Sequence, residues 1–244
     1  MFGLFSSPSG GTGPASAAAV GPVGLTHAVL GTPLAAPLEA GQAEVLFGCG
    51  CFWGAEKGFW RLPGVVTTAV GYAGGQLPSP SYEQVCSGRS GHAEVVRVVW
   101  DTTRVSFADL LKLFWECHDP TQGNRQGNDR GSQYRSAIFV DDPDLLALAE
   151  ASRQAYQDAL TAAGRGTITT EIASGQPFHF AEPYHQQYLA KPGSRPYCSA
   201  QPTGVDLGPF PGATYRLPPL VWESYDWAIP HCVLRGDNAP IALD

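Results

Sequence analysis

The segment of this sequence best suited to nucleophilic chemistry is Gly-Cys-Phe-Trp-Gly at residues 50–54. It follows a short apolar run and opens a predicted helix, so Cys51 falls in the first helical turn. Unpaired backbone N–H groups and the helix dipole stabilise an anion there. Such a position can lower the pKa of cysteine from about 8.5 to about 3.5–7.5, which makes Cys51 a candidate nucleophile. The alternative is a small buried apolar residue, which is what most free cysteines are.

Glu94 is the candidate proton donor. Residues 92–101 alternate as a β-strand does, and Val96, Val98 and Trp100 lie on the same face as Glu94. A carboxyl group on an apolar face loses its hydration, which favours the neutral acid and raises its pKa. Two other arrangements are equally compatible with the sequence: a position at the strand edge, in contact with water, or an ion pair with Arg97 or Arg135.

Two long polar loops carry further groups that could orient a substrate. Asp129 and Tyr134 lie in residues 119–134, a stretch with almost no apolar side chains that leads into a predicted strand. Tyr82 lies in the other loop, within residues 74–91. The ordinary interpretation is a turn-forming aspartate and half-buried tyrosines, so these residues alone leave their role open.

The chain has six cysteines and no Cys-x-x-Cys pair. Six scattered cysteines in 244 residues are too few for a disulfide-stapled scaffold, and Cys49-x-Cys51 has no second cluster at metal spacing. We therefore expect a reducing, cytoplasmic environment and no structural metal. Cys49, Cys86 and Cys117 lie in or beside apolar or strand-like sequence and are expected to be inert, while Cys232 stays undecided.

Cys198 is the candidate partner for an oxidised Cys51. It lies in residues 191–202, where Pro, Gly and Ser predict a mobile segment. A second thiol on such a segment can reach a sulfenic acid and form a disulfide, which is the usual way a sulfenic acid is resolved. The long sequence separation leaves open whether the two cysteines meet.

A protease-like pairing of a cysteine with His118 or His185 is a further alternative. Such pairs must be adjacent in space, and no local signature of those proteases is present. We expect both histidines to pack or to form hydrogen bonds instead.

Hydrophobic periodicity and turn residues predict the elements that must position these groups. The expected strands span residues 44–48, 65–72, 92–101, 135–140 and 167–173, and the expected helices span 51–62, a segment that begins behind Ser106, and 143–163. The order is β-α-β-β-α-β, followed by α-β. A doubly wound parallel fold would need a helix within residues 74–91, which look too rich in Gly, Pro and Ser. We therefore predict an α+β fold, a two-layer ferredoxin-like sandwich with irregular N- and C-terminal segments.

Composition sets the limits of this interpretation. With 43% hydrophobic and 15% charged residues, 29 Gly and 21 Pro, the chain can bury a core but is rich in loops. A net charge of −7 without a basic cluster argues against nucleic acid as a partner, and no apolar run is long enough to span a membrane. We expect a soluble monomer with a low-order lead over residues 1–42, a catalytic domain over 43–199 and a partly packed extension over 200–244.

Seven motifs, in order, resemble the A-type methionine sulfoxide reductases. They are residues 50–54 (GCFWG), 71–75 (GYAGG), 82–83 (YE), 91–94 (GHAE), 118–121 (HDPT), 124–137 (NRQGNDRGSQYRSA) and 185–189 (HQQYL). The resemblance spans roughly residues 43–199. Seven ordered motifs are far more specific than any one of them.

The resemblance implies a role for each polar candidate. Cys51 would attack the sulfoxide sulfur, and Glu94 would protonate the departing oxygen. Tyr82 and Tyr134 would donate hydrogen bonds to that oxygen, and Asp129 would organise the polar part of the site. The products would be methionine and a sulfenic acid on Cys51.

The resemblance also implies the substrate and the reductant. Phe52 and Trp53 would form the apolar wall that receives the substrate methyl group. The substrate would be the S epimer of methionine sulfoxide, free or in oxidised proteins. Cys198 would resolve the sulfenic acid as a disulfide, thioredoxin or another dithiol would reduce that disulfide, and no metal or organic cofactor is implied.

The sequence departs from the family pattern at its cysteines. Many members carry a second recycling cysteine where residues 204–208 (GVDLG) have none, and Cys49 is unexpected beside the first motif. Cys232 is a candidate third thiol. Two other functions stay open: peroxide reduction through a sulfenic acid on Cys51, and a non-catalytic module that binds oxidised methionine side chains or a protein partner.

Overall fold

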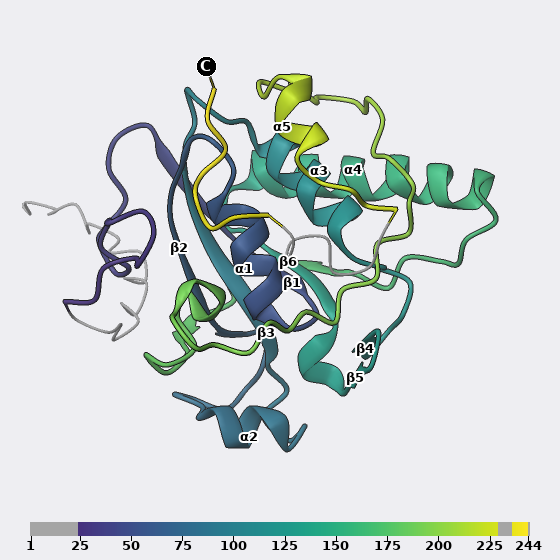
Figure 1. Ribbon diagram of the computed structural model, residues 1–244. Helices are drawn as coiled ribbons and strands as arrows, with labels where there is room; N and C mark the ends of the chain where they lie inside the picture. The colour runs from purple at the N-terminus through teal and green to yellow at the C-terminus, as the bar shows by residue number, and fades with distance from the viewer. Residues whose placement is uncertain (1–23, 229–235, 244) are drawn as a thin grey trace, which may run out of the picture.

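A six-stranded sheet in the order β7-β6-β1-β3-β2-β8 lies at the centre of the computed structural model, which describes residues 24–228 and 236–243 (Figure 1). The strands are β1 (Gln42–Cys49), β2 (Val65–Ala73), β3 (Ala93–Asp101), β6 (Ser136–Phe139), β7 (Glu171–Ala173) and β8 (His179–Phe180). Neighbouring strands are antiparallel except β6 and β7, which are parallel. The predicted α+β class is confirmed, because helices pack on a mostly antiparallel sheet.

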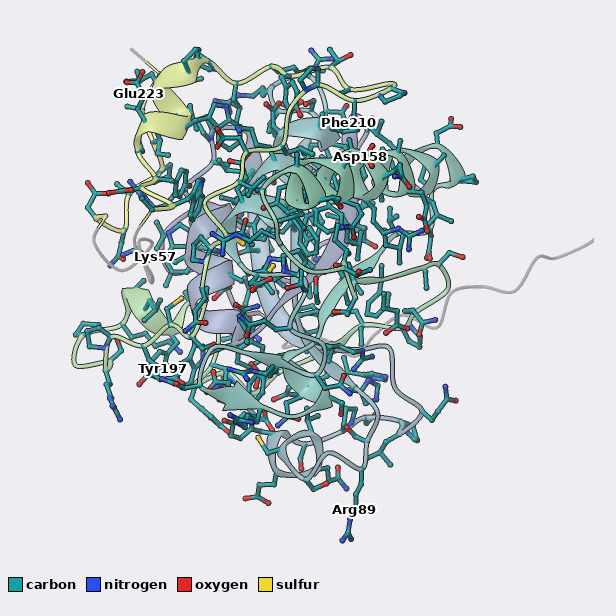
Figure 2. The ribbon with its side chains drawn as sticks, turned by 90° about the vertical axis from the view of Figure 1, so that its right-hand side faces the viewer. Lys57, Arg89, Asp158, Tyr197, Phe210 and Glu223 are labelled. Atoms are coloured by element: carbon teal, nitrogen blue, oxygen red, sulfur yellow. The ribbon has the colours of Figure 1, made fainter. Side chains whose placement is uncertain are left out.

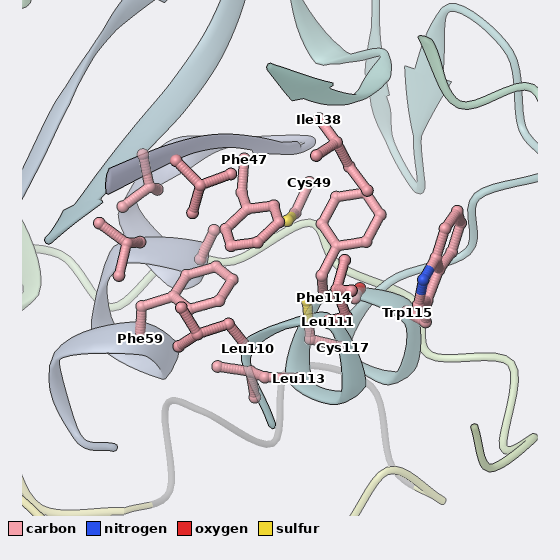
Figure 3. Packing of buried hydrophobic residues seen from close by; sticks show 14 of the residues in the cluster. Phe47, Cys49, Phe59, Leu110, Leu111, Leu113, Phe114, Trp115, Cys117 and Ile138 are labelled. Atoms are coloured by element: carbon pink, nitrogen blue, oxygen red, sulfur yellow. Dashed lines mark hydrogen bonds between the residues drawn. The ribbon is translucent and has the colours of Figure 1, made fainter. Parts of the chain in front are cut away.

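Helices α1 (Phe52–Trp60) and α3 (Phe107–Cys117) pack on one face of the sheet. Phe47 of β1 joins them, because its ring stacks on Phe59 at 4.8 Å and on Phe114 at 5.1 Å (Figure 3). The long helix α4 (Pro143–Ala162) lies against α3, where Ser152 accepts a hydrogen bond from Trp115. None of the helices in the described ranges is long and apolar enough to cross a membrane.

The alternation predicted for β3 determines where Glu94 lies. The even-numbered apolar side chains of β3 belong to the large core under α1 and α3, whereas Ala93 and Val95 belong to a smaller cluster on the opposite face. Glu94 therefore faces the helix layer. It is 2% exposed, so the strand-edge alternative is wrong.

Local capping fixes where two helices begin, as the sequence predicts. The Ser106 hydroxyl accepts from the Asp109 backbone N–H, and the Asp109 carboxylate accepts from the Ser106 backbone N–H, which completes a capping box on α3. At α4, the Asp142 side chain accepts from two backbone N–H groups of the first turn, and Pro143 occupies the first helical position.

Three predictions about elements are wrong in detail. Residues 74–91 contain a short helix, α2 (Tyr82–Cys86), because Ser81 and Gln84 form a capping box that outweighs the surrounding Gly, Pro and Ser. The polar stretch 119–134 contains a hairpin of β4 (Arg125–Gln126) and β5 (Asp129–Arg130) and a 3-10 turn, η1 (Ser132–Tyr134). The strand expected over 167–173 is only the three residues of β7.

Part of the N-terminal lead packs against the sheet. His27 forms a 2.9 Å hydrogen bond with the Thr68 hydroxyl, and Thr32 donates to the Val66 carbonyl at 2.7 Å. Leu34 is fully buried. Residues 1–23 of the predicted lead lie outside the described residues.

The C-terminal segment, residues 200–228 and 236–243, packs on α1 and α3 and includes a short helix, α5 (Pro219–Glu223). Figure 2 shows the chain passing from Tyr197, in the lower left part of the view, to Phe210 and Glu223 near the top. Buried carboxylates of α3 hold it: Glu116 accepts from the Leu207 backbone N–H at 2.7 Å, and Asp109 accepts from two further backbone N–H groups, those of Arg216 and Leu217.

Candidate active site

The nucleophile candidate lies at the junction between β1 and α1, as predicted. Gly50 follows β1 with a φ of +89°, and Cys51 is the N-cap of α1. A side chain at Gly50 would fit neither the backbone nor the space, since an added Cβ would lie 2.6 Å from the Cβ of Gln126. Gly50 is therefore what permits the turn that presents Cys51, and sequence reasoning assigned it no role.

Glu94 is directly connected to this helix start. Its Oε2 accepts a hydrogen bond from the backbone N–H of Phe52 at 3.1 Å, so one of the unpaired amides of α1 is satisfied by the carboxyl group. The predicted alternatives are excluded because Arg97 pairs with Glu44 and Arg135 pairs with Glu171. Glu94 and Cys51 thus share the same helix terminus.

Burial gives Glu94 the properties of an acid near neutrality. Desolvation is the main cause that raises its pKa to about 8, the nearby Asp129 raises it further, and the Phe52 N–H lowers it. Glu94 therefore holds its proton at pH 7, as the sequence predicts.

The expected low pKa of Cys51 is wrong for the structure without substrate. Burial raises the pKa of the Cys51 thiol well above its usual value, and the Trp53 backbone N–H lowers it only in part. The side chain is buried, with 8% of the residue exposed, so loss of hydration outweighs the helix terminus. The resting sulfur is a thiol.

Two tyrosines lie near this acid. The pKa values of Tyr82 and Tyr134 are both raised, by burial first, and the charge of Glu94 contributes to both shifts. Both hydroxyls therefore stay protonated at neutral pH and can donate hydrogen bonds. Glu182, which sequence reasoning did not single out, accepts from the Tyr82 backbone N–H at 2.8 Å and from the Tyr72 hydroxyl at 2.9 Å.

Asp129 completes the polar side of the site. Its Oδ1 accepts a 2.5 Å hydrogen bond from the hydroxyl of Tyr197, a residue that nothing in the sequence marked. Its Oδ2 is buried and has no hydrogen-bond partner among the residues that the structure describes. A buried oxygen of this kind is available to a polar group of a substrate.

The apolar side consists of aromatic rings. Phe52 is buried and Trp53 half-buried, and Trp53 stacks on Tyr188 with ring centroids 3.9 Å apart. The Trp53 indole donates to His185 Nδ1 at 3.2 Å, and burial lowers the pKa of His185 to about 4. His185 is therefore neutral, and it packs and forms hydrogen bonds as predicted. His185 and Tyr188 both belong to the HQQYL motif, and this motif could have indicated that they lie in the site.

The remaining cysteines differ from one another. Cys198 is close enough to Cys51 to raise its pKa, and Cys198 itself is 5% exposed, although residues 191–202 were predicted to be a mobile arm. Cys49 and Cys117 are buried, whereas Cys86 is exposed, contrary to the apolar surroundings expected for it. Cys232 lies outside the described residues.

The site thus brings together the polar candidates Cys51, Glu94, Tyr82, Tyr134, Asp129 and Cys198, with Phe52 and Trp53 beside them. An acid, two phenols and a thiol around one helix terminus can protonate an oxygen and attack the atom that bears it. A protease-like use of His118 is not supported: one of its ring nitrogens lies 2.7 Å from the Phe114 carbonyl and the other 2.8 Å from the Ser136 hydroxyl.

Sequence comparison gives the same assignment. The family model for peptide methionine sulfoxide reductase matches residues 43–206. The enzyme MsrA of Rhodospirillum centenum is 55% identical over 217 residues, which are 86% of this chain and 97% of the relative. MsrA of Azotobacter vinelandii is 59% identical over 189 residues, which are 77% of this chain and 87% of the relative.

Solved structures agree with the sequence relatives. Methionine sulfoxide reductase A of Corynebacterium diphtheriae has 46% identity and a TM-score of 0.69, and covers 80% of this chain and 93% of its own. Mxr1 from Saccharomyces cerevisiae in reduced form has 32% identity and a TM-score of 0.60, and covers 67% of this chain and 92% of its own. This chain therefore belongs to the peptide methionine sulfoxide reductases, a family of oxidoreductases that reduce methionine sulfoxide.

Proposed function

We propose that this chain reduces methionine S-sulfoxide, free or in proteins, with Cys51 as the nucleophile and Glu94 as the acid. One observation carries the proposal: the 3.1 Å hydrogen bond from the Phe52 backbone N–H to Glu94, which holds a buried carboxyl group beside the residue that follows Cys51. The epimer preference comes from the family resemblance alone.

The chemistry requires activation of the substrate oxygen. A sulfoxide is a poor electrophile until its oxygen is protonated, and Glu94, with a pKa raised to about 8, holds a proton at neutral pH. Tyr82 and Tyr134 donate hydrogen bonds where charge develops on that oxygen. The oxygen passes from the substrate sulfur to the Cys51 sulfur, and the Cys51 thiol proton replaces the one that Glu94 gives up, so methionine and a sulfenic acid are formed.

The aromatic residues bind the rest of the substrate. Phe52 and the Trp53 ring, stacked on Tyr188, offer an apolar wall for the sulfoxide methyl group. The unpartnered Oδ2 of Asp129 is a hydrogen-bond acceptor on the polar side. This division of the site orients the sulfoxide oxygen toward Glu94.

Recycling proceeds through a second thiol. Cys198 attacks the Cys51 sulfenic acid, which forms the disulfide and releases water. Thioredoxin, or another dithiol, then reduces the disulfide by thiol–disulfide exchange. The proposal requires no metal or organic cofactor.

We further propose the organisation expected from the sequence: a catalytic domain over residues 43–199 within a cytoplasmic monomer. The strand order β6-β1-β3-β2, with α1 and α3 on one face, supports classification of this domain as a ferredoxin-like sandwich. The extension beyond residue 199 covers the helix layer.

The test is methionine formation from separated S and R sulfoxides, as the free amino acid and in a peptide, with thioredoxin as reductant. We expect turnover of the S epimer only, and none in Cys51→Ser, with far-UV and near-UV circular dichroism unchanged. Cys232→Ser is the matched control for loss of a thiol. Consumption of hydrogen peroxide without methionine formation, or full activity in Cys51→Ser, would contradict the proposal.

A further inference from the structure

Three buried thiols lie behind the catalytic helix. Cys49, Cys117 and Cys198 are 2%, 6% and 5% exposed, and they line one cavity together with small residues of α1. Figure 3 shows the sulfur atoms of Cys49, at the end of β1, and of Cys117, at the end of α3, within the same core layer. None of the steps proposed above uses Cys49 or Cys117.

Cys49 and Cys117 are neighbours in the core. Their sulfur atoms and a ring nitrogen of His118 all lie within 4.8 Å of one another. A disulfide needs the two sulfurs about 2.05 Å apart. Formation of the disulfide therefore requires the two side chains to rotate toward each other.

A metal site is the other interpretation of such a cluster, and the hydrogen bonds of His118 oppose it. His118 Nδ1 lies 2.7 Å from the Phe114 carbonyl oxygen, which can only accept, so Nδ1 carries a proton. His118 Nε2 then accepts from the Ser136 hydroxyl at 2.8 Å. Cys117 also donates its S–H to the Phe114 carbonyl at 3.4 Å, so the Cys117 thiol and both ring nitrogens of His118 are already engaged in hydrogen bonds.

Cys198 connects this pair with the active site. Its charge raises the pKa of Cys51 on one side, and its own pKa responds to the charge of Cys117 on the other. The same small cavity is lined by all three buried thiols and by Gly54, Ala55 and Gly58 of α1, whose small size allows the thiols to approach one another.

We propose that Cys49 and Cys117 are an internal dithiol that takes over the disulfide first formed between Cys51 and Cys198. The inference rests on the function proposed above and extends it: one chain would reduce two sulfoxides before it needs an external reductant.

The exchange balances without any added oxidant or reductant. The Cys117 thiolate attacks Cys198, which breaks the Cys51–Cys198 bond and releases the Cys51 thiolate. Cys49 then attacks Cys117 and releases Cys198. Two protons leave Cys49 and Cys117, and two are taken up by Cys51 and Cys198, so the net change is transfer of one disulfide.

Burial makes this exchange slow. It raises the pKa of Cys198 to about 12, and the hydrogen bond with Cys49, followed by burial, raises the pKa of Cys117 well above its usual value, so few of these thiols are ionised at neutral pH. Only the thiolate attacks a disulfide. Methionine formation without reductant should therefore show a fast first equivalent and a slow second one.

The test is the amount of methionine formed per fully reduced full-length chain, mixed with excess S-sulfoxide and no reductant. We expect about two equivalents for the natural sequence and about one for Cys117→Ala, with the fast phase retained. In Cys49→Ala the exchange should stop at a Cys117–Cys198 disulfide, which frees Cys51 for a second equivalent that ends as a sulfenic acid. Peptide mapping after the slow phase should show a Cys49–Cys117 disulfide. No methionine at all would contradict the proposed function rather than this inference.

Four results would overturn the internal dithiol. The natural sequence could stop at one equivalent, or the second equivalent could survive in Cys117→Ala. It could also be lost in Cys232→Ala, the matched control, which would assign recycling to Cys232. Stoichiometric zinc in the purified protein, released only when Cys49 and Cys117 are alkylated, would make the cluster a metal site instead.

Discussion

Glu94 shows how a single buried carboxyl group becomes an acid. Within the described residues, no cation compensates it, and its only hydrogen bond is donated by the Phe52 amide. Loss of hydration therefore decides its protonation, and the same loss keeps the neighbouring Cys51 a thiol. Glu94 and Cys51 are therefore both protonated before the substrate binds, and the sulfoxide oxygen then accepts the proton from Glu94.

Glu94→Gln should lower kcat by about 10²–10⁴-fold, because an amide cannot give up a proton to the departing oxygen. The sign of the pH dependence follows from the raised pKa: activity needs protonated Glu94, so it is present at lower pH and falls as the pH rises through about 8. A kcat profile from pH 6 to 10 measures this limb.

A second buried glutamate provides the control for this experiment. Glu56, with a pKa raised to about 7, is bound to Gln187 and Thr68 outside the reacting groups. Glu56→Gln should keep the falling limb near pH 8, whereas Glu94→Gln should lose it. The same limb in both variants would mean that another group is the acid.

At the scale of elements, short-range rules place most of the scaffold, because capping and alternation depend on neighbouring residues. The capping box of Ser106 and the faces of β3 follow from the sequence in this way. The pKa of Cys51 does not, because desolvation depends on segments that pack from elsewhere in the chain. The prediction that Cys198 lies on a mobile segment is wrong for the same reason, since its burial depends on distant parts of the chain. Helix α2 was missed because a single capped turn has no periodicity.

Gly50→Ala should be destabilising and should impair the site. An alanine here would have to adopt the positive φ of Gly50, which costs about 1–2 kcal/mol. Its Cβ would also overlap Gln126, which adds about 1–3 kcal/mol. Gly88→Ala is the matched control, since Gly88 also has a positive φ, +71°, but open space around it. Urea unfolding of both variants measures the difference, and equal destabilisation would contradict the overlap at Gln126.

At the scale of the whole molecule, the C-terminal segment is part of the folded unit. Asp109 links it to the core, because one carboxylate caps α3 and also accepts from the backbone N–H groups of Arg216 and Leu217. The Tyr225 hydroxyl donates to the Gly58 carbonyl of α1, and Trp60 donates to the Asn238 carbonyl at 2.9 Å. The helix that begins at Cys51 is thus held at its far end by the last part of the chain.

Asp109→Ala should lower the free energy of unfolding by about 2–4 kcal/mol, because it removes the cap and leaves buried amides without an acceptor. Ser106→Ala removes only the cap and should cost about 1 kcal/mol. Limited proteolysis should cleave the C-terminal segment faster in Asp109→Ala alone. Equal stability and cleavage in the two variants would show that the carboxylate does not anchor the segment.

The attachment of this segment has a practical consequence for protein engineering. A fragment trimmed to residues 43–199 would retain every proposed reacting side chain. It would, however, expose the apolar surfaces of α1 and α3 and remove hydrogen-bond partners of the Asp109 and Glu116 carboxylates. Such a fragment would be prone to aggregation and poorly soluble. Grafts, chimaeras or immobilised biocatalysts built from this protein should therefore carry the chain through residue 243.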